Sequence, residues 1–309
     1  MNNKNFEQPL YHFCSYDTFV KIIQTKKIYM SDITKSNDKF ELQLCHAIAN
    51  EISEEINIYI GKYGIERFKK DFSLLYLEQD IRNACTPNLA WTFCLSKDIK
   101  QLWQWREYAN DLKGIAFETR LNTIKEYINF LNSTNETVSF RGINIKYISE
   151  LPKAQINGFK NWLQLHYKNL SQQNILNSIL RFALKFKLDV FNNESEYRIY
   201  GINKVKKKSK KLTNNNNPRA VGKHILYDKY GETYELKNVK YNIDFKCLPK
   251  NDDIVSHIEC PIKDISRFIN RVWYYDGFND ASEIKQLLNI YIPNNEINVE
   301  PFIATYVPR

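Results

Sequence analysis

Clusters of aromatic and β-branched residues alternate along the chain with stretches in which apolar residues recur every three or four positions. The first pattern is typical of strands and the second of helices. We predict strands at residues 10–14, 28–30, 89–96, 113–118, 139–148, 196–202, 232–248, 254–260, 271–275 and 297–306, and helices at 16–26, 40–84, 99–108, 121–131, 158–188 and after Asp280. Because strands and helices mix without a strict strand–helix–strand order, the pattern indicates an α+β fold.

No internal repeat and no long linker divides the sequence, so we expect a single α+β domain over residues 1–309. The helical segments 40–84 and 158–188 are expected as insertions. Residues 204–223 have no apolar period and are rich in lysine and asparagine, which predicts a basic, mobile loop.

Composition and charge narrow the class of protein. The chain has 309 residues, 43% of them hydrophobic and 26% charged, which excludes disordered, collagen-like and coiled-coil proteins. The formal net charge is +9, and residues 204–223 alone carry eight positive charges and no acid, so the remainder is close to neutral. An anionic partner such as nucleic acid, or a protein acceptor, is therefore expected near this segment rather than over the whole surface.

The exclusions are consistent with a cytoplasmic protein. No leader-like segment opens the chain and no run of about 18 apolar residues occurs, so no membrane association is expected. The six cysteines are scattered and lack the spacing of a zinc site, which predicts reduced thiols. Glycine-rich phosphate loops and serine hydrolase or zinc protease motifs are also missing from the sequence.

Two carboxylates, Glu194 and Glu196, stand two residues apart in a stretch that is predicted to be a strand. Residues at this spacing share one face of a strand, and two acids on one face can prepare a catalytic carboxylate. The alternative is a solvated strand edge on which Arg198 neutralises Glu196.

Three further groups are candidates for binding. His12 follows Tyr11 in the first strand, where a histidine serves as a core residue or as a hydrogen-bond donor to a ligand. Asn37, Asp38 and Glu41 form either a polar rim for a nucleotide or a helix cap. Trp105 and Tyr108 share a helix face, on which they stack on a base or fill the core.

Several of these segments, taken in order, resemble the bacterial domain-of-unknown-function family 2971. They are Leu10–Phe13, Ser31, Asn37-Asp38-x-x-Glu41, Phe93–Ser96, Trp105-x-x-Tyr108-Ala109 with Lys113-Gly114, Lys187, Glu194-x-Glu196-x-Arg198 and Tyr306–Arg309.

The first strand with Tyr-His, the helix and short strand that follow, and the late Glu-x-Glu are also similar to the ADP-ribosyltransferase superfamily. That resemblance implies a central split, mostly antiparallel sheet and an enzyme that consumes NAD by hydrolysis or by transfer of ADP-ribose, as in bacterial toxins and antiviral defence effectors. It implies that Glu196 contacts the nicotinamide ribose, that Glu194 acts on the acceptor and that His12 anchors the ribose. Tyr11, Ser31, Asn37, Glu41, Trp105, Tyr108 and Arg198 would then contact NAD, with no metal required.

Two other hypotheses remain open. Asp38, Glu41, Glu194 and Glu196 could together hold Mg²⁺ in a nuclease. Alternatively, the basic segment 204–223 binds nucleic acid in a protein that is not an enzyme.

Overall fold

The computed structural model describes residues 8–33, 90–135, 137–166, 178, 181–203, 206–207, 224–227, 233–236, 245–250, 253–277 and 280–303. The predicted helical segment 40–84, the residues Asn37, Asp38 and Glu41, and most of the basic segment 204–223 lie outside these ranges. The chain divides into two compact units, one of residues 1–31, 89–143 and 193–309 and the other of residues 32–88 and 144–192. The single domain expected from the sequence stays a prediction.

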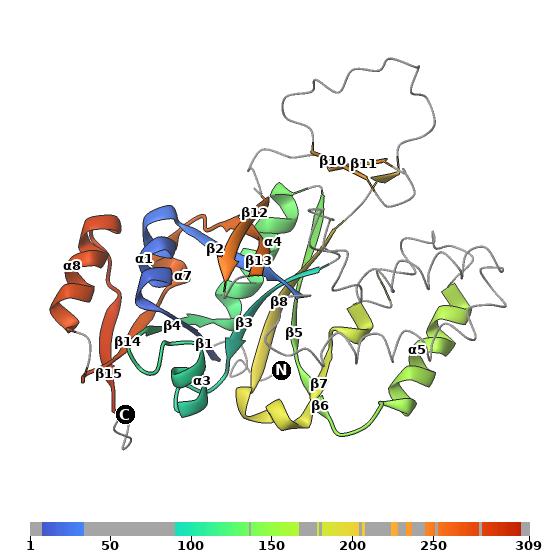
Figure 1. Ribbon diagram of the computed structural model, residues 1–309, viewed down its shortest axis with the longest axis horizontal. Coiled ribbons are helices and arrows are strands. Elements are labelled where there is room, and N and C mark those ends of the chain that lie inside the picture. Colours follow the sequence, from blue (N-terminus) through green and yellow to red (C-terminus); the bar gives the residue numbers. More distant parts are fainter. Residues whose placement is uncertain are drawn as a thin grey trace, which may run out of the picture. The chain divides into compact units, whose positions relative to one another are not determined.

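The first unit is built on a 10-stranded sheet (Figure 1). Its strands are β1 (Pro9–Cys14), β2 (Lys27–Asp32), β3 (Ala90–Ser96), β4 (Ile115–Arg120), β5 (Val138–Asn144), β8 (Glu196–Asn203), β12 (Phe245–Lys250), β13 (Asp253–Pro261), β14 (Arg271–Tyr275) and β15 (Asn298–Phe302). Their order is β12-β13-β2-β3-β1-β4-β14-β15, with β8 pairing β3 and β5. β14 and β15 run parallel, whereas β1–β4, β3–β8, β2–β13, β12–β13 and β4–β14 are antiparallel. The predicted α+β class with a mostly antiparallel sheet is confirmed.

The sheet divides at β3. A strand has two edges, and β8 pairs with β3 along its whole length, from Ala90 opposite Ile202 to Ser96 opposite Glu196. Since β1 and β2 are also neighbours of β3, these two strands must share its other edge. The register of β1 against β3 contains a single pair, Tyr11 opposite Ser96, so β1 leaves β3 after this point.

Four helices cover one face of this sheet. They are α1 (Tyr16–Thr25), α4 (Leu121–Thr134), α7 (Ile265–Phe268) and α8 (Ala281–Tyr291), and their apolar residues join Leu10, Phe93 and Phe117 of the strands in one buried cluster. The helix starts follow the sequence, because Ser15 caps α1 and Asp280 caps α8 through bonds to backbone N–H groups. We call this side of the sheet the apolar face.

The opposite side carries polar side chains, and we call it the polar face. The short helix α3 (Leu102–Glu107) packs there through Trp105, which lies in a second cluster with Tyr11, Phe13 and Phe302. α3 is shorter than predicted, because its N-cap Gln101 makes no capping bond and Asp98 instead accepts a hydrogen bond from the Lys100 N–H.

The second unit contains β6 (Lys146–Ile148) paired in parallel with β7 (Phe186–Leu188), and α5 (Lys153–His166). The prediction of helix over 158–188 is wrong at its end, since Phe186–Leu188 form a strand. The 3-10 helix η5 (Asp189–Glu194) then leads the chain back into the first unit.

A separate three-stranded sheet has the order β10 (His224–Tyr227), β11 (Thr233–Leu236) and β9 (Lys206–Lys207).

The turn that joins α3 to β4 leaves no room for a side chain at Gly114. Three consecutive residues, Asn110, Asp111 and Leu112, have positive φ angles of 49°, 51° and 72°, and the turn closes with the Gly114 N–H donating to the Ala109 carbonyl at 2.7 Å. A Cβ at Gly114 would overlap the Cys14 carbonyl oxygen and lie 2.8 Å from that of Ala109. Both obstacles are backbone atoms, which cannot move aside as a flexible side chain would.

We predict that Gly114→Ala lowers the free energy of unfolding by about 1–3 kcal/mol, the usual cost of overpacking. The matched control is Gly158→Ala in α5, where an added Cβ meets nothing within 4 Å and the change should stabilise the helix by about 0.5–1 kcal/mol. Urea unfolding of both variants measures the difference. Equal stability of the two variants would contradict the tight packing of this turn.

Candidate functional site

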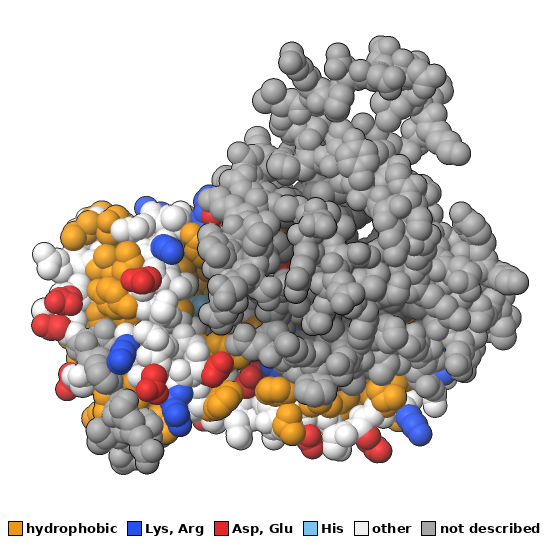
Figure 2. Space-filling view, in the orientation of Figure 1, with side chains coloured by type: hydrophobic (Ala, Val, Ile, Leu, Met, Phe, Trp, Pro, Cys, Tyr) orange, Lys and Arg blue, Asp and Glu red, His pale blue; other side chains and the backbone are white. Residues whose placement is uncertain are grey.

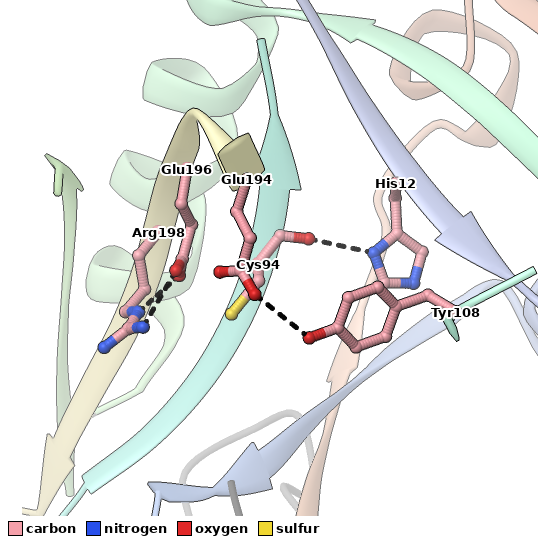
Figure 3. A network of polar contacts seen from close by, with 6 residues as sticks. All are labelled: His12, Cys94, Tyr108, Glu194, Glu196 and Arg198. Atoms are coloured by element: carbon pink, nitrogen blue, oxygen red, sulfur yellow. Dashed lines mark hydrogen bonds and ion pairs between the residues drawn. The ribbon is translucent and has the colours of Figure 1, made fainter. Parts of the chain in front are cut away.

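Glu194 and Glu196 do not share a strand, contrary to the prediction. Glu194 is the last residue of η5, β8 begins at Glu196, and Ser195 between them has a φ of 45°. A left-handed residue interrupts the alternation of side chains that an extended chain would have. The two carboxylates therefore meet different partners (Figure 3).

Glu196 is held by Arg198, two residues further along β8. The Arg198 Nε donates to Glu196 Oε1 at 2.5 Å, and Nη2 donates to Oε2 at 3.0 Å. Both side chains are almost fully buried, with exposed fractions of 2% for Arg198 and 3% for Glu196. Arg198 thus neutralises Glu196 as the alternative interpretation expected, but in the interior and not at a solvated strand edge.

Glu194 faces α3. The Tyr108 hydroxyl, at the C-terminal cap of α3, donates to Glu194 Oε1 at 3.4 Å (Figure 3). The backbone carbonyl of Glu194 accepts a hydrogen bond of 2.9 Å from the Ser96 hydroxyl at the end of β3. Glu194 is buried as well, so its carboxylate lies in a site that excludes most water.

A row of polar residues crosses the polar face from Glu196. Residues directly opposite one another on neighbouring strands point to the same side of a sheet. The registers place Glu196 opposite Ser96, Ser96 opposite Tyr11, Tyr11 opposite Glu118, and Glu118 opposite Arg271. The structure therefore brings Tyr11 into line with Glu196 on the same face.

Burial, with a further contribution from the negative charge of Glu118, raises the pKa of Tyr11 to about 12. The hydroxyl of Tyr11 is consequently a hydrogen-bond donor at every physiological pH.

Glu118 and Arg271 were missed in the sequence. The Arg271 Nε lies 4.0 Å from a carboxylate oxygen of Glu118 and 3.3 Å from one of Glu300. The available signal was Glu118 itself, an acid at the end of the apolar strand Ile115–Ala116–Phe117, where charged residues are rarely buried without a partner.

His12 lies on the opposite, apolar face. It stands opposite Phe117 in β4, and its ring stacks on Phe93 with the ring centroids 4.2 Å apart. The His12 Nδ1–H donates to the Cys94 carbonyl at 3.0 Å, at the point where β1 separates from β3. The structure does not bring this ring to the side of the sheet that carries Glu196, Arg198 and Tyr11.

Of the other residues predicted to contact NAD, some lie in the core and some lie on the polar face. Trp105 is fully buried, stacks on Phe302 and donates through Nε1 to the Ile99 carbonyl, so it is a core residue and has no exposed ring for a base. Tyr108 is half-buried and faces Glu194. Ser31 is exposed in β2 and alternates with Met30 of the apolar core, which places it on the polar face. Asn37 and Glu41 lie outside the described residues.

Cysteine exposure also distinguishes the two faces. Of the cysteines whose side chains are described, Cys14 and Cys260 are buried and Cys94 is exposed. Cys94 stands opposite Arg198 on the polar face. Burial raises the pKa of the Cys14 thiol to about 12 and that of Cys260 further.

No group of three or more His, Cys, Asp or Glu residues with metal-binding geometry occurs among the described residues. Since Asp38 and Glu41 are not among them, the four-carboxylate magnesium site stays a prediction. Within the described part of the chain, no helix is both long and apolar enough to cross a membrane.

Residues 104–199 match the family model described as "Protein of unknown function (DUF2971)". This segment, about a third of the chain, runs from α3 into β8 and so contains Tyr108, Glu194, Glu196 and Arg198 but not His12. The resemblance to this family is confirmed over these residues. No curated protein and no solved structure matches the chain.

The surroundings of His12 make the free energy of unfolding depend on pH. Burial lowers the pKa of this ring to about 4, although its bond to the Cys94 carbonyl acts in the opposite direction. An unfolded histidine titrates near pH 6.5, so between about pH 6.5 and 4 the unfolded chain binds more protons than the folded chain. This contribution to stability is present in full above about pH 6.5 and is lost as the pH falls to about 4.

We therefore expect a loss of up to about 3 kcal/mol across this window in the wild type and a smaller loss in His12→Gln. Urea unfolding at a series of pH values measures both. The ring resonances of His12 should titrate near pH 4 and report the tautomer protonated at Nδ1. Titration of this ring near pH 6.5 would contradict a neutral ring withdrawn from water.

Proposed function

We propose that the protein is an ADP-ribosyltransferase-like enzyme that breaks the bond between nicotinamide and ribose in NAD. The observation that carries this proposal is the pair of carboxylates at the start of β8, one paired with Arg198 and the other bonded to the Tyr108 hydroxyl. The division of the sheet at β3 adds support, because the superfamily resemblance implies a split sheet.

The chemistry explains why acids are needed at this place. As the C1′–N bond breaks, its electron pair leaves with nicotinamide and positive charge develops on the ribose. A fixed carboxylate in a site with little water stabilises that charge strongly. The incoming nucleophile, water or an acceptor group, then bonds to C1′ and loses a proton to a base.

The geometry favours a division of labour between the two acids. Both oxygens of Glu196 accept hydrogen bonds from Arg198, which hold this side chain in place. We assign the contact with the ribose, or with the acceptor proton, to Glu194, which faces the half-buried Tyr108. In this assignment Glu196 supplies negative charge and orientation without touching the ribose. The superfamily resemblance implies a direct ribose contact for this residue instead.

The polar face offers a further group to a dinucleotide. Tyr11 stands in the same cross-strand row as Glu196, and a hydroxyl that remains protonated suits the ribose and phosphate oxygens of NAD. On the face shown in Figure 2, basic and acidic side chains of the described residues are interspersed, in keeping with a body that is close to neutral. We propose that a macromolecular acceptor binds at the basic segment 204–223, with nucleic acid as the first candidate. A macromolecular acceptor is expected of a toxin or defence effector.

The proposal predicts that the purified protein releases nicotinamide from NAD, alone or with nucleic acid or lysate as acceptor. Glu194→Gln should lower the rate by about 100-fold or more, the usual range for loss of a catalytic acid or base. Glu126→Gln, an exposed surface acid on α4, is the matched control and should change nothing. Mass analysis measures both nicotinamide and the added ADP-ribose.

Arg198 and Glu196 require a paired variant, because removal of one takes away the opposite charge with which the other is buried. Glu196→Leu with Arg198→Met should fold, since apolar replacement of a buried ion pair is often neutral. We expect this folded variant to turn over NAD slowly. Wild-type protein that releases no nicotinamide under any of these conditions would refute the proposal, and magnesium-dependent cleavage of nucleic acid would replace it with the nuclease hypothesis.

Cys94 provides a native probe of the same face. Iodoacetamide should alkylate Cys94 in the folded protein and leave Cys14 and Cys260 unmodified, because burial keeps these two thiols protonated and inaccessible. NAD should slow the alkylation, and Cys94→Ser identifies the modified peptide. If NAD gives no protection at saturating concentration, the dinucleotide does not bind beside β3.

A further inference from the structure

The end of β3 holds the segment that carries both carboxylates through two hydrogen bonds. The Ser96 hydroxyl donates to the Glu194 carbonyl at 2.9 Å, and the Lys97 N–H donates to the Ser195 carbonyl at 3.1 Å. Both bonds come from the end of β3, where Ser96 is opposite Glu196 in the register. Ser96 is itself buried, with an exposed fraction of 3%, so water does not readily replace its bond.

The conformation of Ser195 decides where the two acids point. In an extended chain Glu194 would project on the same side as Glu196 and the two negative charges would repel each other. The φ of 45° at Ser195 turns the chain, so that Glu194 meets Tyr108 while Glu196 meets Arg198. A non-glycine residue in this region is uncommon and persists only where the surroundings enforce it.

We infer that Ser96 and Ser195 are positioning residues, which together set the separation of Glu194 from Glu196 and aim Glu194 at the substrate. This inference deepens the proposed function and, for its kinetic part, rests on it. Neither serine touches the reacting atoms. Their effect on the reaction passes through the placement of the Glu194 carboxylate.

The first test compares substitutions at Ser195. Glycine adopts positive φ freely, whereas a β-branched residue does so only with strain. Ser195→Gly should therefore keep NAD turnover within about twofold of the wild type, and Ser195→Val should lose about 100-fold, the scale expected when a reacting group is displaced by about 1 Å. If Ser195→Val fails to fold, Ser195→Ala and the Ser96 variants carry the comparison.

The second test removes the hydroxyl of Ser96. Ser96→Ala should lower kcat by about 100-fold with KM within about twofold, and Ser96→Thr, which keeps the hydroxyl, should restore part of the rate. The matched control is Ser133→Ala on α4, which deletes a bond of 2.8 Å from a serine hydroxyl to a backbone carbonyl in an exposed position. A structural role alone would lower stability without this split between kcat and KM.

A third measurement needs no enzymatic activity. In protein labelled with ¹³C at glutamate, the carboxyl resonance of Glu194 is identified by its loss in Glu194→Gln. At constant pH its chemical shift should change in Ser96→Ala and remain in place in Ser133→Ala, because the hydrogen-bond geometry around the carboxylate sets its surroundings.

The outcomes separate the two claims. If the wild type does not consume NAD, the proposed function fails, and the Glu194 resonance still decides whether Ser96 positions this acid. If the wild type consumes NAD but Ser96→Ala and Ser195→Val match it in rate and resonance, the positioning role is overturned and the proposed function stands.

Discussion

The buried ion pair between Glu196 and Arg198 is the constraint around which the site is arranged. Each of these two buried charges compensates the other, and removal of either one costs about 3–5 kcal/mol. The two residues lie two apart at the start of β8, which pairs with β3 along its whole length. The chain enters β8 from η5 through the left-handed Ser195. Arg198 is therefore paired with Glu196, and Glu194 is directed to Tyr108 instead.

The sheet separates two kinds of chemistry. On the apolar face, helices α1, α4, α7 and α8 bury aliphatic and aromatic side chains, and His12 joins them as a neutral ring that satisfies the Cys94 carbonyl where β1 diverges. On the polar face, Glu196, Ser96, Tyr11, Glu118 and Arg271 align across neighbouring strands. Since successive residues of a strand point to opposite sides, Tyr11 and His12 are adjacent in sequence and yet belong to different environments.

Helix α3 packs on the polar face and brings a hydroxyl to Glu194. Trp105 anchors the helix between Phe13 and Phe302, and this packing brings Tyr108, three residues later, to Glu194. The turn of left-handed residues after α3 closes against Gly114 and returns the chain to β4. Trp105, which was predicted to stack on a base or fill the core, is therefore a support of the helix, and Tyr108 is the residue that contacts Glu194.

The sequence by itself determined the identity of most elements. Periodicity and capping residues located β1, α1, β3, β4, α8 and β14 closely, because local propensity and the alternation of apolar residues are properties of neighbours in the chain. It also selected Glu194, Glu196, Arg198 and Tyr11 as residues of interest. Only the tertiary structure decided how they are paired. Strand register decides the opposite placement of His12 and the alignment of Glu118 with Arg271. Hydrogen bonds between segments far apart in sequence, such as that from Ser96 to Glu194, accompany the left-handed Ser195. No local pattern in the sequence encodes this register or these bonds.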